Sequence, residues 1–368
     1  MISRRALFGA GLALAGCRRK RSSGFPGYAF VANQEGQAVA AVDLTAFAVI
    51  RHIRLNAQPT EVASAAGVRS VFALTPDTGT IHEIPIDKLE VTRKAQRGAA
   101  ALSMRVRGKT LMALYRSPRK LSALRIADLQ PAWEAPLPGE ARDFDVSPDG
   151  ETAAVSFGAE GRIALVDATT RKVRSIVTDT EVGAVRFQSD GRALIAADLG
   201  RRMLLIYDVE TARLIVRLPL AVRPDNLCFN PDGGQLFVTG DGLDAAVVVY
   251  PYHTPQVAET VLAGRGPAAM AASDTRPPYL FITNPPSGEV SILNITTRRV
   301  ISVAAVGAEP GYVTVTPDQQ FALVLNRKSG DMAVLRIHAD MANRAKTAAL
   351  FTMIPVGSKP VSAVVREA

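Results

Sequence analysis

Residues 277–300 contain the stretch that decides the fold. It reads Tyr279-Leu-Phe-Ile-Thr-Asn284, then Pro-Pro-Ser-Gly, then Val290-Ser-Ile-Leu-Asn-Ile295, then Thr-Thr-Arg-Arg and a further apolar run from Val300. Short runs rich in Val, Ile, Phe and Tyr, separated by Gly, Pro, Asn and Ser, are typical of β-strands joined by tight turns. The stretch therefore predicts strand, turn, strand, turn, strand.

The same unit recurs along most of the chain. Turns ending in Asp-Gly place Gly150, Gly191 and Gly233 at spacings of 41 and 42 residues. Extending this spacing leads back to Gly108 and Gly67, and forward to degenerate turns near positions 276 and 318. Each period carries four strand-like runs; the second and third are apolar nearly throughout, and the fourth is more charged. Four strands every 40 to 45 residues is the signature of a β-propeller blade.

The two ends of the chain indicate a closed ring rather than a solenoid of stacked sheets. The first unit begins with Tyr28–Asn33 and lacks an innermost strand, whereas the solitary run Val361–Arg366 follows Pro360 at the other end. We therefore predict an all-β fold, with residues 28–368 forming a single propeller of four-stranded antiparallel blades. The C-terminal strand is expected to pair into the first blade.

Counting the units gives eight blades. Two of the units, 60–98 and 99–140, are weaker matches to the repeat than the others. Seven blades is therefore the alternative, if one of these two units folds irregularly.

The N-terminus carries the features of an export signal. Residues 1–17 combine a charged start, an apolar run from Ala6 to Ala15 and small residues before Cys17. The apolar run is too short to cross a bilayer core of about 30 Å as a helix. The following residues, 18–27, are basic and contain Gly and Pro, so we expect a flexible tether there.

Two short motifs refine this signal. The segment around Arg4 and Arg5 resembles the twin-arginine export motif. Leu14–Cys17 resembles the bacterial lipobox, in which the cysteine is acylated and becomes the first residue of the mature protein. These resemblances imply an exported lipoprotein held at a membrane of the cell envelope, facing the periplasm or the cell surface.

The positive charge is concentrated in the same segment. Six of the 43 basic residues and none of the 34 acidic residues lie within residues 1–21, so the remaining body is close to neutral. Nucleic-acid binding needs a basic face with interleaved aromatic side chains, and only 6% of the residues are aromatic. We expect no nucleic-acid partner, and we expect a monomer.

The repeat resembles a known family. Tyr28–Asn33 with Val39–Asp43, and Tyr279–Asn284 with Val290–Asn294, look like the bacterial YVTN repeat. This likeness, which covers residues 28–368, identifies the chain as similar to YncE-like propeller proteins. It implies the propeller fold but no activity, because the motif residues build blades rather than sites.

A ligand of a propeller is expected at one mouth of the central channel. The loops predicted there carry many Arg residues and nearly as many acids, which fits a pocket for an anionic small molecule, a peptide or a glycan, or else a solvated rim of paired charges. The candidate ligand contacts are Arg142, Asp143, Arg223, Asp225, Arg265 and Tyr312.

Other chemistry has weaker support in the sequence. The histidines lie in four different units without metal-ligand spacing, at His52, His82, His253 and His338. Cys228, in an apolar run, is expected to be a buried small hydrophobe. Propeller lactonases, the haem d1 domain of nitrite reductases and quinoprotein dehydrogenases share the architecture, but the base, axial histidine or tryptophan motifs that they need are not recognised here. We therefore assign no cofactor and no metal.

The predicted function is a non-catalytic binding or scaffold module of the cell envelope, with a protein, glycan or small anionic ligand at the channel mouth. The alternative is an envelope hydrolase or lactonase with a carboxylate and Arg site at the same mouth. For that alternative the candidate acids and bases are Asp143, Asp145 and Asp225.

Overall fold

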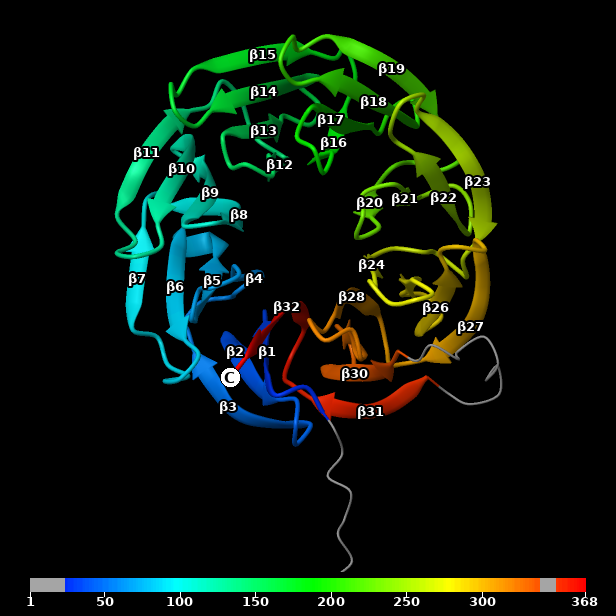
Figure 1. The fold of residues 1–368 in the computed structure, drawn as a ribbon. Helices are drawn as coiled ribbons and strands as arrows, with labels where there is room; N and C mark the ends of the chain where they lie inside the picture. The colour runs from blue at the N-terminus through cyan, green and yellow to red at the C-terminus, as the bar shows by residue number, and fades with distance from the viewer. Residues whose placement is uncertain (1–23, 338–348) are drawn as a thin grey trace, which may run out of the picture.

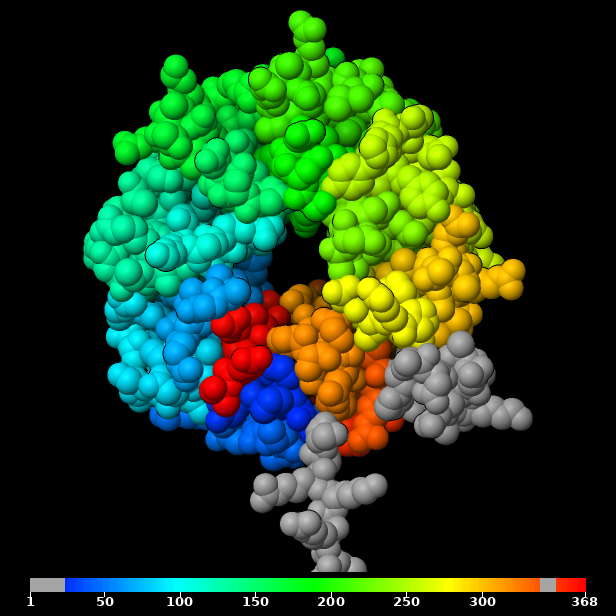
Figure 2. Space-filling model, viewed as in Figure 1, coloured from blue at the N-terminus to red at the C-terminus, as the bar shows by residue number. Residues whose placement is uncertain are grey.

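The structure, a computed structural model, describes residues 24–337 and 349–368. Their strands form eight four-stranded antiparallel sheets, arranged as blades around a central opening (Figures 1 and 2). The eight-bladed propeller is therefore confirmed. The seven-bladed alternative is wrong, because both weak units, 60–98 and 99–140, form complete blades.

The strands of blades 1 to 4, each given from the channel outward, have the following bounds. Blade 1 contains β32 (Pro360–Glu367), β1 (Gly27–Asn33), β2 (Ala38–Asp43) and β3 (Ala48–Arg54). Blade 2 contains β4 (Glu61–Ala63), β5 (Ser70–Thr75), β6 (Thr80–Pro85) and β7 (Arg93–Gln96), with a 3-10 turn, η1 (Pro76–Thr78), between β5 and β6. Blade 3 contains β8 (Ala100–Arg107), β9 (Thr110–Ser117), β10 (Arg119–Arg125) and β11 (Pro131–Pro136). Blade 4 contains β12 (Asp143–Val146), β13 (Thr152–Ser156), β14 (Arg162–Asp167) and β15 (Val173–Val177).

Blades 5 to 8 follow the same order. Blade 5 contains β16 (Val182–Phe187), β17 (Ala193–Asp198), β18 (Met203–Asp208) and β19 (Leu214–Pro219). Blade 6 contains β20 (Asn226–Phe229), β21 (Leu236–Thr239), β22 (Ala245–Tyr250) and β23 (Gln256–Leu262). Blade 7 contains β24 (Met270–Ala272), β25 (Tyr279–Asn284), β26 (Glu289–Asn294) and β27 (Arg299–Ala305). Blade 8 contains β28 (Pro310–Val315), β29 (Phe321–Asn326), β30 (Asp331–Arg336) and β31 (Leu350–Pro355).

The two ends of the chain close the ring as predicted. In Figure 1 the red strand β32 lies beside the blue strand β1. The two strands pair antiparallel, with Phe30 opposite Val364 and Gly27 opposite Glu367. Because β32 supplies the innermost strand of blade 1, the first and last parts of the chain share one sheet.

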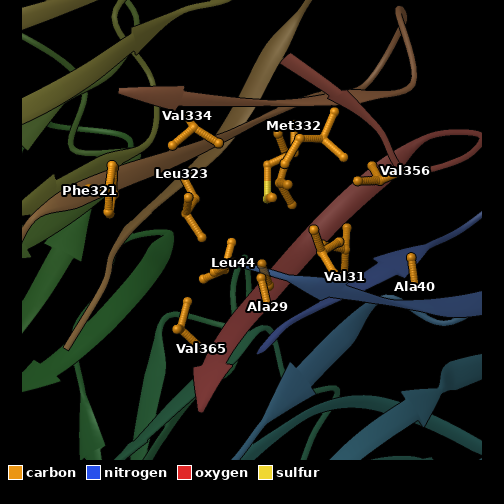
Figure 3. Packing of buried hydrophobic residues seen from close by; sticks show 14 of the residues in the cluster. Ala29, Val31, Ala40, Leu44, Phe321, Leu323, Met332, Val334, Val356 and Val365 are labelled. Atoms are coloured by element: carbon orange, nitrogen blue, oxygen red, sulfur yellow. The ribbon is translucent and has the colours of Figure 1, made fainter. Parts of the chain in front are cut away.

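The core lies between the blades. Between blades 8 and 1, side chains such as Val31, Leu323 and Val334 interlock and are inaccessible to solvent (Figure 3). The second and third strands of most blades are buried on both faces, which explains their nearly continuous apolar sequences. The fourth strands, of which β15 is an example, are mostly exposed, as expected for an outer edge open to water.

The asparagine of the repeat motif has a structural role. It ends the second strand of its blade and packs against a glycine in the loop that leads into the innermost strand of the same blade. A Cβ on that glycine would lie 2.5 to 2.8 Å from the asparagine Nδ2, so a larger residue does not fit without a shift. The pairs are Asn33 with Gly357, Asn284 with Gly264, and Asn326 with Gly307.

The described chain begins inside the region predicted to be a flexible tether. Phe25 is only 2% exposed and belongs to the core between blades 1 and 8. Gly27 is the first residue of β1, and its N–H group donates to the Phe25 carbonyl at 2.8 Å. The predicted tether boundary therefore needs correction, because residues 24–27 are part of the propeller. Arg4, Arg5, Cys17 and residues 18–23 lie outside the described residues.

In residues 24–337 and 349–368, no helix is long and apolar enough to cross a membrane.

Candidate functional site

The innermost strands of the eight blades surround a central channel, which is visible as the opening in Figure 2. A cavity of about 570 Å³ lies in the channel wall between β4, β8, β28 and β32. Its lining extends from Glu61 and Tyr312 to Arg107, at the end of β8, and to Pro317, in the turn that follows β28. The cavity is therefore lined by polar and apolar groups together.

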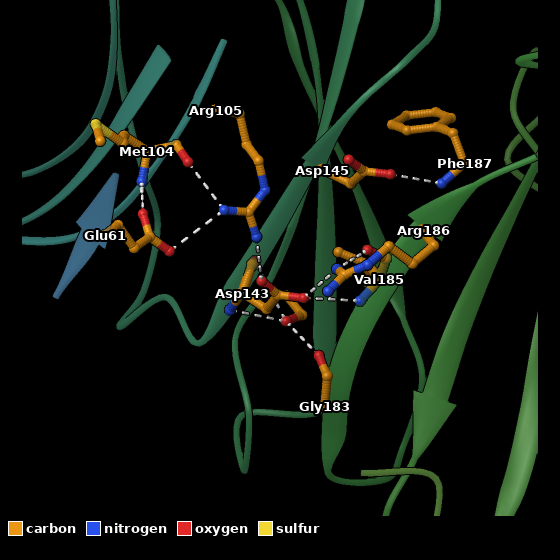
Figure 4. A network of polar contacts seen from close by, with 10 residues as sticks. Glu61, Met104, Arg105, Asp143, Asp145, Gly183, Val185, Arg186 and Phe187 are labelled. Carbon is orange, nitrogen blue, oxygen red and sulfur yellow. Dashed lines mark hydrogen bonds and ion pairs between the residues drawn. The ribbon is translucent and has the colours of Figure 1, made fainter. Parts of the chain in front are cut away.

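Four charged side chains of alternating sign link the innermost strands on one side of the channel (Figure 4). Arg105 Nη1 lies 3.4 Å from Glu61 Oε1, and Arg105 Nη2 lies 3.5 Å from Asp143 Oδ1. Arg186 Nη1 lies 2.6 Å from Asp143 Oδ2. These side chains are 19 to 30% exposed, so each faces the channel while remaining largely desolvated. Asp143 thus bridges two guanidinium groups from neighbouring blades.

The carboxylates of this chain also bind backbone groups of the next blade. An innermost strand has one free edge, whose N–H groups need partners when they are buried. Glu61 Oε2 accepts from Met104 N–H at 2.6 Å, and Asp143 Oδ2 accepts from Val185 N–H at 3.2 Å. Each acid therefore satisfies an edge donor that no strand covers.

Three further residues make similar links between blades. Asp145 Oδ2 accepts from Phe187 N–H at 2.9 Å. Ser362 Oγ accepts from Val62 N–H at 3.2 Å, and the Tyr312 hydroxyl donates to the Ala363 carbonyl at 2.9 Å. We call this set the inner girdle: Glu61, Arg105, Asp143, Asp145, Arg186, Tyr312 and Ser362. It fastens the innermost strands of successive blades to one another.

Burial shifts the ionisation of several groups in the channel. Burial raises the pKa of Glu61, although Arg105 and the Met104 N–H group oppose this effect. Burial opposes the charge of Arg186, but Asp143 and Asp145 outweigh it and raise the pKa of this guanidinium. Burial also raises the pKa of Tyr312, and it raises the pKa of Cys228, on β20 near Arg186, to about 12. Tyr312 and Cys228 are therefore protonated near neutral pH.

The structure separates the six predicted ligand contacts into two groups. Asp143 and Tyr312 belong to the inner girdle, and Tyr312 also lines the cavity. The other four are on loops at one end of the ring. Arg142 pairs with Glu181 at 3.0 Å, and Arg223 pairs with Asp225 at 2.8 Å. Asp225 also accepts from Asp241 N–H at 3.0 Å, which is a turn-capping contact. Arg265 is exposed.

Sequence reasoning missed Glu61, Arg105 and Arg186. Each is a charged residue within a short apolar strand, and each contacts a side chain 38 to 44 residues away. That separation is close to the period of the repeat. Charged residues on the innermost strands of four consecutive units, blades 2 to 5, were therefore the available signal.

The loops at the end of the ring that carries Arg142, Arg223 and Arg265 enclose hollows of their own. One, of about 1010 Å³, lies between Pro285–Gly288 and Ala305–Glu309. A smaller one, of about 450 Å³, is lined by residues that include Arg142 and Glu160. This end therefore offers open surfaces, lined by polar and apolar groups, of a size that suits a ligand or a peptide.

Metal ligands do not gather in the described part of the chain, where no three His, Cys, Asp or Glu side chains are placed to hold an ion. His52 lies on β3, at the outer edge of blade 1, and His253 lies in the turn before β23. His82 is buried on β6, where its Nε2 lies 3.1 Å from Thr75 Oγ1, and burial lowers its pKa to about 4. None of these three is on an innermost strand, and His338 is outside the described residues.

Known proteins resemble the chain in fold. No family model matches it, and no curated protein matches it. Among solved structures, dihydro-heme d1 dehydrogenase NirN in complex with DHE is similar with a TM-score of 0.77 and 14% identity, over 92% of this chain and 75% of that one. AztD from Citrobacter koseri gives 0.69 and 14%, over 92% and 98% of the two chains. BamB from Moraxella catarrhalis gives 0.60 and 16%, over 81% and 90%. At such identities the likeness establishes the β-propeller fold alone.

Proposed function

We propose that this protein is a lipid-anchored propeller of the cell envelope that works as a non-catalytic binding or scaffold module. Export and anchoring are supported by Arg4, Arg5 and the lipobox-like Leu14–Cys17. Membership of the YncE-like group is supported by the YVTN-type strands Tyr279–Asn284 and Val290–Asn294. The bound partner is a protein, a glycan or a small anionic ligand, held at the mouth of the channel.

One observation favours binding over catalysis: the carboxylates of the channel already accept hydrogen bonds from the protein itself. Glu61, Asp143 and Asp145 each accept a backbone N–H group from the next blade, and the first two also contact arginines. A general base needs a lone pair aimed at the substrate proton. Side chains committed to holding blades together are poorly suited to that role.

The fold supports a binding role as well. One structure with the same fold, NirN, was solved in complex with DHE, so a propeller of this shape can hold a small ligand. In this chain the hollows between the loops, one of about 1010 Å³, provide open space. Arg265, exposed in the loop between β23 and β24 at the same end of the ring, is available to an anionic group.

Affinity capture from membranes tests this proposal. Full-length lipidated protein and the variants Arg223→Ala, Asp225→Ala and Arg265→Ala are used as bait after cross-linking. A matched control is Arg213→Ala, an exposed arginine in the turn between β18 and β19, at the opposite end of the ring. Loss of the captured partner in the loop variants but not in the control supports the mouth site, and undiminished capture by all three loop variants refutes it.

The lipid anchor has its own test. Cys17→Ser removes the acceptor of the acyl chain, so the protein should move from the membrane fraction to the soluble fraction. A variant that stays with the membranes after a high-salt wash refutes the lipoprotein assignment.

A hydrolase or lactonase is the second candidate, and the buried carboxyl of Glu61 is the observation that favours it. Burial raises the pKa of this group, as general acids in clefts require. Hydrolysis of p-nitrophenyl butyrate and of a γ-lactone by the wild type, abolished in Glu61→Gln, would replace the binding role with a catalytic one. Rates equal to the buffer blank remove the hydrolase from consideration.

A further inference from the structure

The position of the docked N-terminal residues shows at which end of the ring the tether begins. Gly24 lies against the turn between β2 and β3, where an added Cβ would be 2.0 Å from the Leu44 carbonyl oxygen. Leu44 N–H donates to the Gly27 carbonyl at 3.0 Å. At the other terminus, Ala368 N–H donates to the Pro26 carbonyl at 3.3 Å. The beginning of the described chain, its C-terminus and the β2–β3 turn therefore share one end of the ring.

Strand direction assigns every loop of the propeller to one of two faces. Because neighbouring strands of a blade are antiparallel, turns between first and second strands lie at the same end as turns between third and fourth strands. The β2–β3 turn is of the latter kind, so we call this end the tether face. The opposite end, the loop face, carries the turns between second and third strands and the loops into innermost strands. Arg142, Arg223 and Arg265 are on the loop face.

The tether, even when fully extended, is only a little longer than the ring is tall. Cys17 and Gly24 are seven residues apart, and such a segment spans at most about 25 Å when fully extended. A strand of six residues, which is the common length in this ring, is about 20 Å tall, and a chain must also travel around the outer strands. A lipid attached at Cys17 therefore holds the bilayer near the tether face.

We propose that the propeller stands on the membrane with its tether face toward the lipid surface and its loop face toward the aqueous space. This orientation rests on the lipid anchor of the proposed function. Four cations follow Cys17 in the sequence, Arg18 to Arg21, and add attraction to anionic headgroups beside the anchor. The loop-face hollows then point to partners in solution, whereas the lining of the cavity of about 570 Å³ includes Pro317, on a tether-face turn.

A pair of dye positions in blade 1 tests the orientation. Thr45, exposed in the β2–β3 turn, reports on the tether face, and Ser358, exposed in the loop before β32, reports on the loop face. Thr45→Cys or Ser358→Cys is introduced into full-length lipidated protein that also carries Cys228→Ser. Each thiol is labelled with an environment-sensitive dye. The protein is then added to vesicles of phosphatidylethanolamine and phosphatidylglycerol that contain headgroup-nitroxide lipids.

The expected result is at least threefold stronger quenching at Thr45→Cys than at Ser358→Cys. Vesicle flotation of the same samples separates the two hypotheses. Protein that floats but shows equal quenching, or stronger quenching at Ser358→Cys, refutes the orientation and leaves the anchor intact. Protein that does not float refutes the anchor, and the orientation falls with it.

Discussion

Replacing Asp143 by alanine tests whether the inner girdle holds the blades together. The substitution removes the carboxylate that Arg105 and Arg186 share, and it leaves Val185 N–H without its acceptor. Breaking a fully buried charge pair costs about 3 to 5 kcal/mol. Because Asp143 is 19% exposed and the two arginines are 28 to 30% exposed, water compensates part of this cost. We expect the free energy of unfolding to fall by about 2 to 3 kcal/mol at neutral pH.

Urea denaturation followed by tryptophan fluorescence measures this loss. Trp133, the single tryptophan, lies on β11 and packs against the core cluster that joins blades 3 and 4. The control is Asp128→Ala, which removes an exposed partner of Arg125 and should leave the denaturation midpoint unchanged. If Asp143→Ala changes the midpoint no more than the control does, the carboxylate does not hold the blades together and our account of the channel is wrong.

Four further predictions follow from burial and ring closure. Because folding raises the pKa of Glu61 above its usual 4.5, the folded state binds its proton more tightly, and stability should fall as the pH rises above about 4.5; stability measured against pH should be flatter in Glu61→Gln. Cys228 should react very slowly with iodoacetamide at pH 8, because a pKa of about 12 lowers its thiolate fraction about a thousandfold relative to a thiol of pKa 9, and mass spectrometry with a urea-unfolded control checks this. Deleting residues 360–368 removes β32 and opens the ring, so calorimetry should show a melting temperature lower by more than about 10 °C. Phe25→Ala should lower the free energy of unfolding by about 3 to 5 kcal/mol if residues 24–27 belong to the propeller. A change below about 0.5 kcal/mol would instead support the predicted tether of residues 18–27.

The fold could be predicted because its determinants are local. Strand and turn chemistry is repeated in each unit, so an error in one blade does not disturb the count. The positive φ of Gly67, Gly108, Gly150, Gly191 and Gly233, between 53° and 81°, shows why the turn glycines marked the period so clearly. Ring closure could also be predicted, because the solitary strand at Val361–Arg366 supplies the innermost strand that is lacking before Tyr28. The tether boundary was missed because burial of Phe25 depends on blade 8, more than 290 residues away.

The channel was less predictable because its contacts are not local. Glu61, Arg105, Asp143 and Arg186 are neighbours only after blades 2 to 5 have been placed side by side. The sequence prediction placed ligand contacts on loops and so included Arg142 and Arg223, which pair with acids near the rim in the structure. Position within the repeat, rather than charge alone, distinguishes the two groups. The strand registers place Glu61 and Asp143 at one position of the innermost strand, and Arg105 and Arg186 two residues further along, so an alignment of the units separates the acids from the arginines.

The two groups also differ in how freely they can serve a ligand. A girdle side chain ties an edge N–H group or a guanidinium of the next blade, so redirecting it to a ligand leaves a buried group without a partner. A loop-face residue such as Arg265 is exposed, so its binding to a ligand leaves no buried group of the next blade without a partner. Substitution there should alter binding while the propeller keeps its stability, whereas substitution of Asp143 should lower stability first. Measuring capture and unfolding for the same variants therefore distinguishes residues that build the ring from residues that bind.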